Sequence, residues 1–172
     1  MAGSGAPHQS HDARGLTVTI VHGQWHDVIA GGLLEGARRA LTAMGARIRE
    51  VPVAGAFELP VVAQAVLERD ADAFVALGVI LRGGTPHFDY IAHAATEGLT
   101  QVALRTGKPV GFGVLTIDDE AQGIARAGLP GSDEDTGAKA AEAAVGAALA
   151  IQSLRRGPAD ARPAPGADPR PD

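Results

Sequence analysis

The sequence predicts an α/β fold in which a four-stranded parallel sheet is covered by helices on both faces. Three observations lead to this prediction. Short β-branched or apolar runs alternate with longer segments whose apolar residues recur at helical spacing. The run over residues 73–81 is apolar throughout, as expected of a strand that is buried on both faces. The regular alternation indicates that a helix crosses over between successive strands, which makes those strands parallel.

The predicted elements follow one another along the chain with recognisable ends. A β-branched run at 16–21 stops before Gly23 and predicts the first strand. Between Asp27 and Met44 the apolar residues fall on one helical face, and Gly45 ends this helix. The same reasoning predicts further strands at 47–53, 73–81 and 110–115, and further helices at 58–68, 88–106, 119–127 and 135–155.

A chain of 172 residues is expected to hold one domain and some additional chain. We expect the folded body to span residues 15–156. The segment 1–14 is polar and rich in Gly, Ser and His, and the segment 157–172 holds five of the 11 prolines. Neither segment can bury enough apolar surface to offset the entropy lost on ordering. Both are therefore predicted to be flexible tails.

Composition excludes several classes of protein. The chain is 45% hydrophobic and 20% charged, which is typical of a globular domain, and its net charge of -5 argues against a general nucleic-acid binder. The absence of Cys excludes disulfides, thiolate metal sites and a Cys nucleophile. No apolar stretch is long enough to span a bilayer, and the start lacks the pattern of a signal peptide. We expect a cytoplasmic protein with neither nucleic acid nor membrane as partner.

Functional residues are expected where the strands end. In parallel sheets with helices on both faces, ligands bind outside the carboxyl ends of the strands. Those ends fall near residues 22–26, 54–58, 79–89 and 113–119. Side chains at these four exits are therefore the candidates for binding and catalysis.

The strongest candidate site follows the buried strand at 73–81. Gly83 and Gly84 allow close approach of the backbone to a ligand, Thr85 suits a helix N-cap, and Pro86 suits the first turn. Free amides and the helix dipole at such a place favour an anion, with phosphate as the natural guest. His87 lies in that first turn and is a candidate for proton transfer near neutral pH. A capped helix with an inert surface His is the alternative.

Three other features lie at strand exits or close to them. The turn at 55–60 presents backbone amides, the ring of Phe57 and the carboxylate of Glu58, which suit a polyhydroxylated or heterocyclic ligand. The alternative is a Gly turn with an acidic helix start. Trp25 is the only Trp and is either a packing residue or a stacking surface. Arg126 either complements a helix dipole or grips a phosphate with two hydrogen bonds.

Metal and nucleotide sites are not predicted. His22 and His26 are four residues apart, and His87, Asp89 and His93 share a helical segment, but neither spacing is an established ligand pattern. The chain contains neither the Gly-rich dinucleotide fingerprint nor a Walker loop. We therefore expect no metal and no nucleotide cofactor.

Four motifs in order along the chain are more specific than any single feature. They are Gly55-Ala56-Phe57-Glu58-Leu59-Pro60, the run from Ala76 to Tyr90 (ALGVILRGGTPHFDY), the run from Pro109 to Thr116 (PVGFGVLT), and Arg126-Ala127-Gly128. Together they resemble the lumazine synthase family over residues 15–156. The resemblance implies a three-layer, flavodoxin-like sandwich.

The resemblance also implies an activity. Members of this family condense 5-amino-6-(D-ribitylamino)uracil with 3,4-dihydroxy-2-butanone 4-phosphate to give 6,7-dimethyl-8-ribityllumazine. An imine forms, phosphate leaves, and ring closure with loss of water completes the product. This is a transferase reaction and the penultimate step of riboflavin biosynthesis. It requires neither metal nor organic cofactor, so the expected partners are small-molecule substrates and further copies of the chain.

Roles are assigned by position within the resemblance. Residues expected to contact the pyrimidine and the ribityl chain are Trp25, Ala56, Phe57, Glu58, Val79, Ile80, Leu81 and Phe112. Residues expected to bind the phosphate are Gly84, Thr85 and Arg126. His87 is the expected proton-transfer residue. In the family, Phe112 and Arg126 come from a neighbouring subunit. The loop 129–135 is longer and more acidic than is typical of family members that form icosahedral shells, so the resemblance implies a pentamer or a dimer of pentamers rather than a larger shell.

The chain departs from the family pattern at two positions. Thr136 stands where the family commonly has Lys, and Ile117 where it frequently has Thr. Lys139 lies one helical turn further on and is a candidate to restore the missing charge. An alternative is therefore a weakly active or non-catalytic protein that binds flavin or lumazine. An archaeal-type riboflavin synthase is disfavoured by the Gly-Gly-Thr loop and Arg126, which suit a phosphorylated substrate.

Overall fold

A four-stranded, all-parallel sheet forms the centre of the molecule. The computed structural model describes residues 11–156. The strands are β1 Thr17–Gly23, β2 Arg47–Val53, β3 Ala73–Leu81 and β4 Val110–Ile117. Their order across the sheet is β2-β1-β3-β4, and every neighbouring pair is parallel. The predicted fold class is confirmed.

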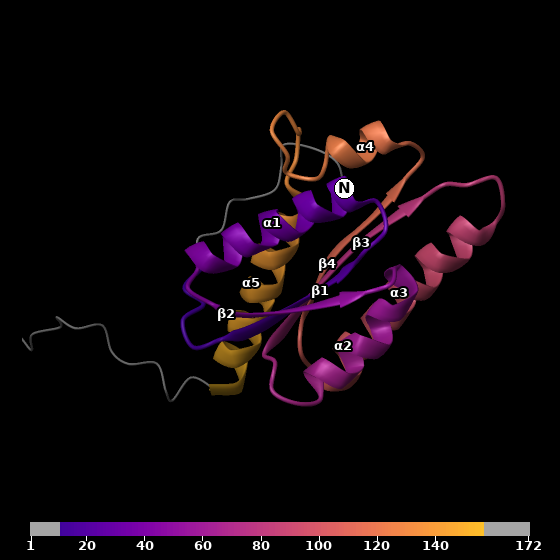
Figure 1. Cartoon of the computed structure of the whole chain (residues 1–172). Coiled ribbons are helices and arrows are strands. Elements are labelled where there is room, and N and C mark those ends of the chain that lie inside the picture. The colour runs from indigo at the N-terminus through magenta and orange to yellow at the C-terminus, as the bar shows by residue number, and fades with distance from the viewer. Residues whose placement is uncertain (1–10, 157–172) are drawn as a thin grey trace, which may run out of the picture.

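Helices cover both faces of this sheet and complete three layers. The helical segments are α1 Asp27–Ala43, the 3-10 segment η1 Ala56–Glu58, α2 Leu59–Leu67, α3 His87–Thr106, α4 Glu120–Ile124 and α5 Thr136–Arg156. Helices α1 and α5 pack together on one face, and α2 and α3 pack on the other (Figure 1). The crossover from β1 to β2 runs in the opposite direction across the sheet from those that follow, so crossovers of one handedness place α1 on one face and α2 and α3 on the other.

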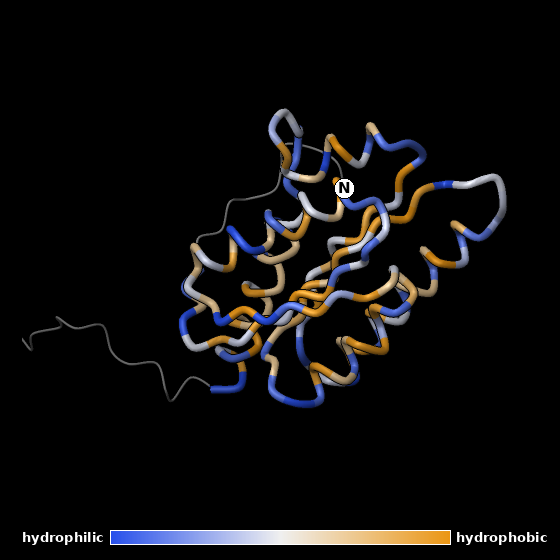
Figure 2. The backbone as a smooth tube through the Cα atoms, in the orientation of Figure 1, coloured by the Kyte–Doolittle hydropathy of each residue, from blue (hydrophilic) through white to orange (hydrophobic). Residues whose placement is uncertain are grey.

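Strand β3 joins the two cores on opposite faces of the sheet. Side chains alternate along a strand, so those of β3 divide between the layers. The residues in the core under α1 and α5 are Ala73, Val75, Leu77 and Val79, and those in the core under α2 and α3 are Phe74, Ala76 and Ile80. Figure 2 shows the resulting concentration of hydrophobic residues on the central strands.

Glycines allow α1, α5 and β4 to approach one another closely. A Cβ atom at Gly137 on α5 would overlap the carbonyl oxygen of Leu33 on α1. A Cβ at Gly111 on β4 would likewise overlap the carbonyl oxygen of Ala140 on α5. Backbone thus meets backbone at these positions, and the layer spacing depends on the absence of side chains there.

Two predicted helices are shorter than their sequence patterns indicated. In the structure, the helix predicted at 58–68 is preceded by a separate turn. An α-helix that included Ala56 would need the N–H of residue 60 to donate to the carbonyl of Ala56, and Pro60 has no N–H. The N–H of Leu59 bonds Ala56 instead, which makes the 3-10 segment η1. Helix α4 ends at Ile124, after which the N–H groups of Arg126 and Ala127 donate three residues back, to Gly123 and Ile124, instead of four.

The described part of the predicted N-terminal tail packs against the folded body. Ala13 is fully buried, and its N–H donates to the carbonyl of Met44 at 2.8 Å. Residues 11–14 therefore belong to the body, rather than to a flexible tail as the sequence suggested. Residues 1–10 and the predicted tail at 157–172 lie outside the described residues.

The ion pair between Arg38 on α1 and Glu50 on β2 predicts acid-sensitive stability. Arg38 Nε donates to Glu50 Oε1 at 2.7 Å, and this contact with the guanidinium holds the pKa of Glu50 below its ordinary value. The stabilisation from this ion pair is complete above about pH 4.3, the pKa of Glu in an unfolded chain. It is lost as the pH falls through the lowered pKa of Glu50 in the folded protein. We expect Glu50→Gln to lower the urea midpoint at about pH 7 but much less at about pH 2. Equal losses at both pH values would contradict this origin.

Candidate active site

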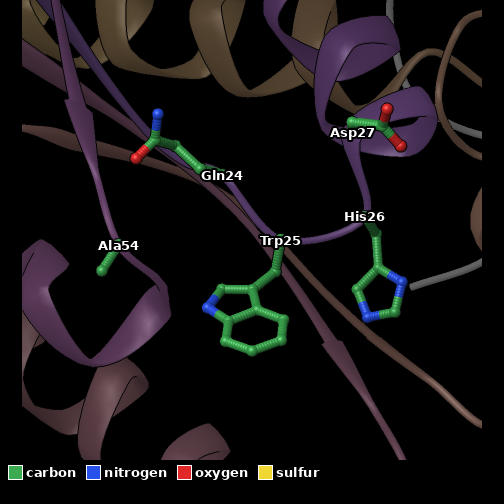
Figure 3. A pocket seen from close by; sticks show the side chains of 5 residues that line it. All are labelled: Gln24, Trp25, His26, Asp27 and Ala54. Atoms are coloured by element: carbon green, nitrogen blue, oxygen red, sulfur yellow. The ribbon is translucent and has the colours of Figure 1, made fainter.

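A surface pocket of about 420 Å³ lies where β1 ends. It is lined by Gln24, Trp25, His26, Asp27 and Ala54. The side chain of Trp25 is 68% exposed, so Trp25 is not a packing residue of the core. Figure 3 shows its indole pointing away from the start of α1, where Asp27 lies. An exposed indole at the carboxyl end of a parallel strand is suited to stacking on a flat ligand.

The backbone next to Trp25 is held in an uncommon conformation. His26 has a φ of 58°, in the left-handed region that non-glycine residues rarely adopt. Its Nδ1 lies 3.7 Å from Glu120 Oε1 on α4. Residues in such conformations concentrate at ligand sites, where the surrounding structure maintains them.

The turn after β2 packs against this pocket. Glu58 Oε2 accepts a 2.9 Å hydrogen bond from the N–H of Gly55, which closes the turn. The edge of the Trp25 indole lies beside Gly55, and a Cβ there would be 3.3 Å from Trp25 Cδ1. Ala56 is buried, whereas the ring of Phe57 is 61% exposed. The turn therefore places the Glu58 carboxylate near the indole and exposes the ring of Phe57.

The carboxyl end of β3 offers backbone groups to a ligand. Among the described strands, β1 pairs with β3 only as far as His22 opposite Leu77, while β4 continues beside β3 to Leu81. The backbone N–H and C=O groups of Val79–Leu81 that point toward β1 therefore lie beyond the last residue pair between β1 and β3. The side chains of Val79 and Ile80 are themselves buried. Recognition here would use amides and carbonyls, as the resemblance implies.

The Gly-rich loop leads into α3 as expected, but its capping differs from the prediction. Helix α3 begins at His87 with Pro86 as its N-cap, and no side chain caps it. Thr85 is therefore not the N-cap. Pro86 takes that position because its ring sets φ to the helical value, -63°. Gly84, Thr85 and His87 are all exposed, so their polar groups face solvent.

Arg82 links this loop to the end of β4. Its Nε donates to Asp118 Oδ1 at 2.7 Å, and its guanidinium carbon lies 4.0 Å from the centre of the Phe88 ring. The backbone N–H of Arg82 donates to the carbonyl of Ile117. These contacts fix the two ends of the loop that carries Gly84 and Thr85, a function that the sequence patterns did not reveal.

Arg126 lies on the α1 and α5 side of the sheet. Its Nη1 donates to the carbonyl of Gln122 at 2.9 Å, which is the helix-end contact considered from the sequence. This contact uses one of the five guanidinium N–H donors. The backbone carbonyl of Arg126 accepts the N–H of Thr136 at 3.0 Å, so the substituted position adjoins Arg126.

Lys139 does not replace the charge missing at Thr136. Its Nζ lies 2.8 Å from Glu134 Oε2. This hydrogen bond is the main cause that holds the pKa of Glu134 below its ordinary value, and the charge of Arg126 contributes further. The ammonium of Lys139 is thus engaged by a neighbouring carboxylate.

The predicted residues do not all meet within one chain. Trp25, Ala56–Glu58 and Val79–Leu81 gather at one edge of the sheet, because Ala56 packs on Gly78 and Gly55 lies beside Trp25. Phe112 lies near the start of β4 opposite Ala76, away from that edge, and is 44% exposed.

Sequence reasoning named only Trp25 as a candidate substrate contact among the residues that line the pocket. The other four are Gln24, His26, Asp27 and Ala54. The rule that ligands bind at strand ends pointed to the ranges 22–26 and 54–58, but it could not tell which side chains line a cavity.

Within the described residues, no three His, Asp or Glu side chains gather as a metal site would require. No helix between residues 11 and 156 has the length and hydropathy to cross a bilayer.

The chain is similar in sequence to known proteins over most of its length. The sequence profile described as 6,7-dimethyl-8-ribityllumazine synthase matches residues 15–152. The chain is 61% identical over 158 residues to the protein of that name from Clavibacter michiganensis, covering 90% of this chain and 99% of the relative. It is 62% identical to the one from Leifsonia xyli (90% and 99% covered) and 50% identical to the one from Streptomyces coelicolor (90% and 97%). The chain belongs to the 6,7-dimethyl-8-ribityllumazine synthase family.

Proposed function

We propose that this chain condenses 5-amino-6-(D-ribitylamino)uracil with 3,4-dihydroxy-2-butanone 4-phosphate to form 6,7-dimethyl-8-ribityllumazine, with release of phosphate and water. One observation carries the proposal beyond family membership. An exposed indole, a turn closed by Glu58 and the extended end of β3 meet at one edge of the sheet. That combination suits a flat heterocycle with a polyhydroxylated side chain.

Each substrate is assigned to its own set of residues. Trp25 stacks on the pyrimidine, and backbone groups of Val79–Leu81 bond its polar edge. The turn at Ala56–Glu58 holds the ribityl chain. Gly84, Thr85 and Arg126 bind the phosphate, which suits a Gly-rich loop that leads into a helix N-terminus. His87, at that terminus, transfers protons as the amine attacks the carbonyl, phosphate leaves and the ring closes.

The complete site requires more than one copy of the chain. Phe112 lies away from the pocket and is partly exposed, so it is free to close the site of a neighbouring subunit. Three large apolar side chains on α2 and α3 are also exposed, at Val61, Tyr90 and Leu104. Apolar surface of this kind favours association. We assign a pentamer or a dimer of pentamers in the cytoplasm, each subunit built around the folded body of residues 11–156.

A direct assay tests the proposal. Purified protein is mixed with both substrates, and lumazine absorbance and phosphate release are followed against the uncatalysed reaction. Catalysed formation of both products in equal amounts is the expected result. Background rates, with the pyrimidine still bound and quenching Trp25 fluorescence, would favour the second candidate, a non-catalytic protein that binds flavin or lumazine.

That second candidate stems from Thr136, and its test is Thr136→Lys. If the wild-type chain is already an active synthase, Thr136→Lys is expected only to tighten binding of the phosphorylated substrate, because the added cation would lie next to Arg126. The expected result is a fall in the KM for that substrate of roughly tenfold, as one charged hydrogen bond can supply. Thr136→Gln, without the charge, is the control. Turnover that appears only in the Lys variant would support the binding protein.

A further inference from the structure

The carboxylate of Asp135 lies at a junction of three parts of the fold. Its Oδ1 accepts the N–H of Ala138 at 2.9 Å, in the first turn of α5. Its Oδ2 accepts a 2.7 Å hydrogen bond from Arg39 Nη2 on α1. Asp135 therefore joins α5 to α1 through two charge-assisted contacts.

Two glycines make room for this carboxylate. A Cβ at Gly36 on α1 would overlap Asp135 Oδ1, and a Cβ at Gly128 would crowd Asp135 Cγ. Gly128 also has a φ of 69°, which a residue with a side chain adopts only under strain. The carboxylate thus fills a slot bounded by α1 on one side and by the segment after Arg126 on the other.

The same slot determines where the backbone of Arg126 lies. Ala127 and Asp135 form an antiparallel bridge, and the N–H of Gly128 donates to the carbonyl of Glu134 at 2.9 Å. On the other side of that bridge, the N–H of Thr136 donates to the carbonyl of Arg126 at 3.0 Å. Any shift of Asp135 along α1 would move Arg126 with it.

We propose that Asp135 is the positioning residue for Arg126, and that the ion pair with Arg39 holds the Arg126 guanidinium where the phosphate of the substrate binds. The proposal rests on the proposed function, which assigns that phosphate to Arg126. Both carboxylate oxygens of Asp135 are bonded within the fold. It acts by fixing the bridged segments 125–128 and 134–136 on α1.

Charge, rather than shape alone, is required of Asp135. Asp135→Asn keeps an acceptor for the N–H of Ala138 and fits the same slot, but it loses the charge that faces Arg39. Arg39→Gln removes the cation of the same ion pair and leaves Asp135 unchanged. Each variant is expected to raise the KM for the butanone phosphate about tenfold, as for one displaced charged hydrogen bond, while the KM for the pyrimidine changes less than about twofold.

A double-mutant cycle separates positioning from general destabilisation. Arg126→Gln is combined with Asp135→Asn, and each variant is assayed for both KM values and titrated calorimetrically with inorganic phosphate. Once Arg126 is absent, Asp135→Asn is expected to add less than about a twofold effect on phosphate binding. Glu50→Gln is the matched control, because it breaks the other ion pair that anchors α1 and lies outside the bridged segments.

The outcomes distinguish this proposal from the proposed function. Full additivity in the cycle, or equal losses for both substrates, would overturn the role of Asp135 while leaving the synthase intact. A wild-type chain without turnover would overturn the proposed function, and the phosphate titrations would still test Asp135. Unchanged phosphate binding in Arg126→Gln would overturn the assignment of Arg126 and, with it, that of Asp135.

Discussion

Replacing His87 by Ala is expected to lower kcat by about 10²–10⁴-fold, the range typical of a lost general acid–base group. His87 is the first residue of α3, directly after the Gly-rich loop, and its side chain is exposed. Truncation there removes no core contact, so the loss should fall on turnover and not on folding. Steady-state rates of lumazine formation give kcat, and urea unfolding checks stability.

The control is His93→Ala, on the same helix. His93 is also exposed and faces Glu97, with its Nε2 2.9 Å from the carboxylate. It lies nearly two turns beyond the loop, so its removal should leave kcat within about twofold. Added imidazole should partly restore the activity of the His87 variant and leave wild type unchanged. A His87 variant with normal kcat would remove this residue from the mechanism.

Replacing Gly137 by Ala is expected to destabilise the fold by about 1–3 kcal/mol, the usual cost of an extra methyl in a tightly packed place. The new Cβ would overlap the carbonyl of Leu33, which α1 cannot withdraw without moving as a whole. The shift in the urea midpoint at constant slope measures the loss.

Gly31→Ala provides the comparison on α1. Within the described residues, a Cβ at Gly31 meets open space. Alanine is the better helix former by about 1 kcal/mol, so this variant should gain stability from the same chemical change. Equal midpoints for the two variants would mean that α1 and α5 separate at little cost.

Local patterns predicted most of the framework. The bounds of β2 and β3 agree with the predicted runs at 47–53 and 73–81. Strand β3 is apolar throughout, and β2 lies between Gly45 and Gly55, so the local pattern alone was sufficient. The start of α3 was predicted to within one residue, because proline fixes φ near the helical value, but Thr85 is not the N-cap that the sequence suggested.

The shape of the candidate site depended on contacts between distant segments. Trp25 could have been a core residue, and only the structure shows that its indole is 68% exposed and lies beside Gly55 on the turn after β2. Lys139 was expected to restore a charge, but Glu134 engages it in the folded chain.

The sequence by itself determined the strands, the parallel sheet and the edge at which ligands are predicted to bind, because these follow from periodicity and from the rule for carboxyl ends. Only the tertiary structure decided how Arg126 is held. Asp135 meets Arg39 across 96 residues of chain, and a contact at that separation leaves no local pattern. Such a contact forms only when the segment before α5 packs on α1, so that the carboxylate enters the slot between Gly36 and Gly128.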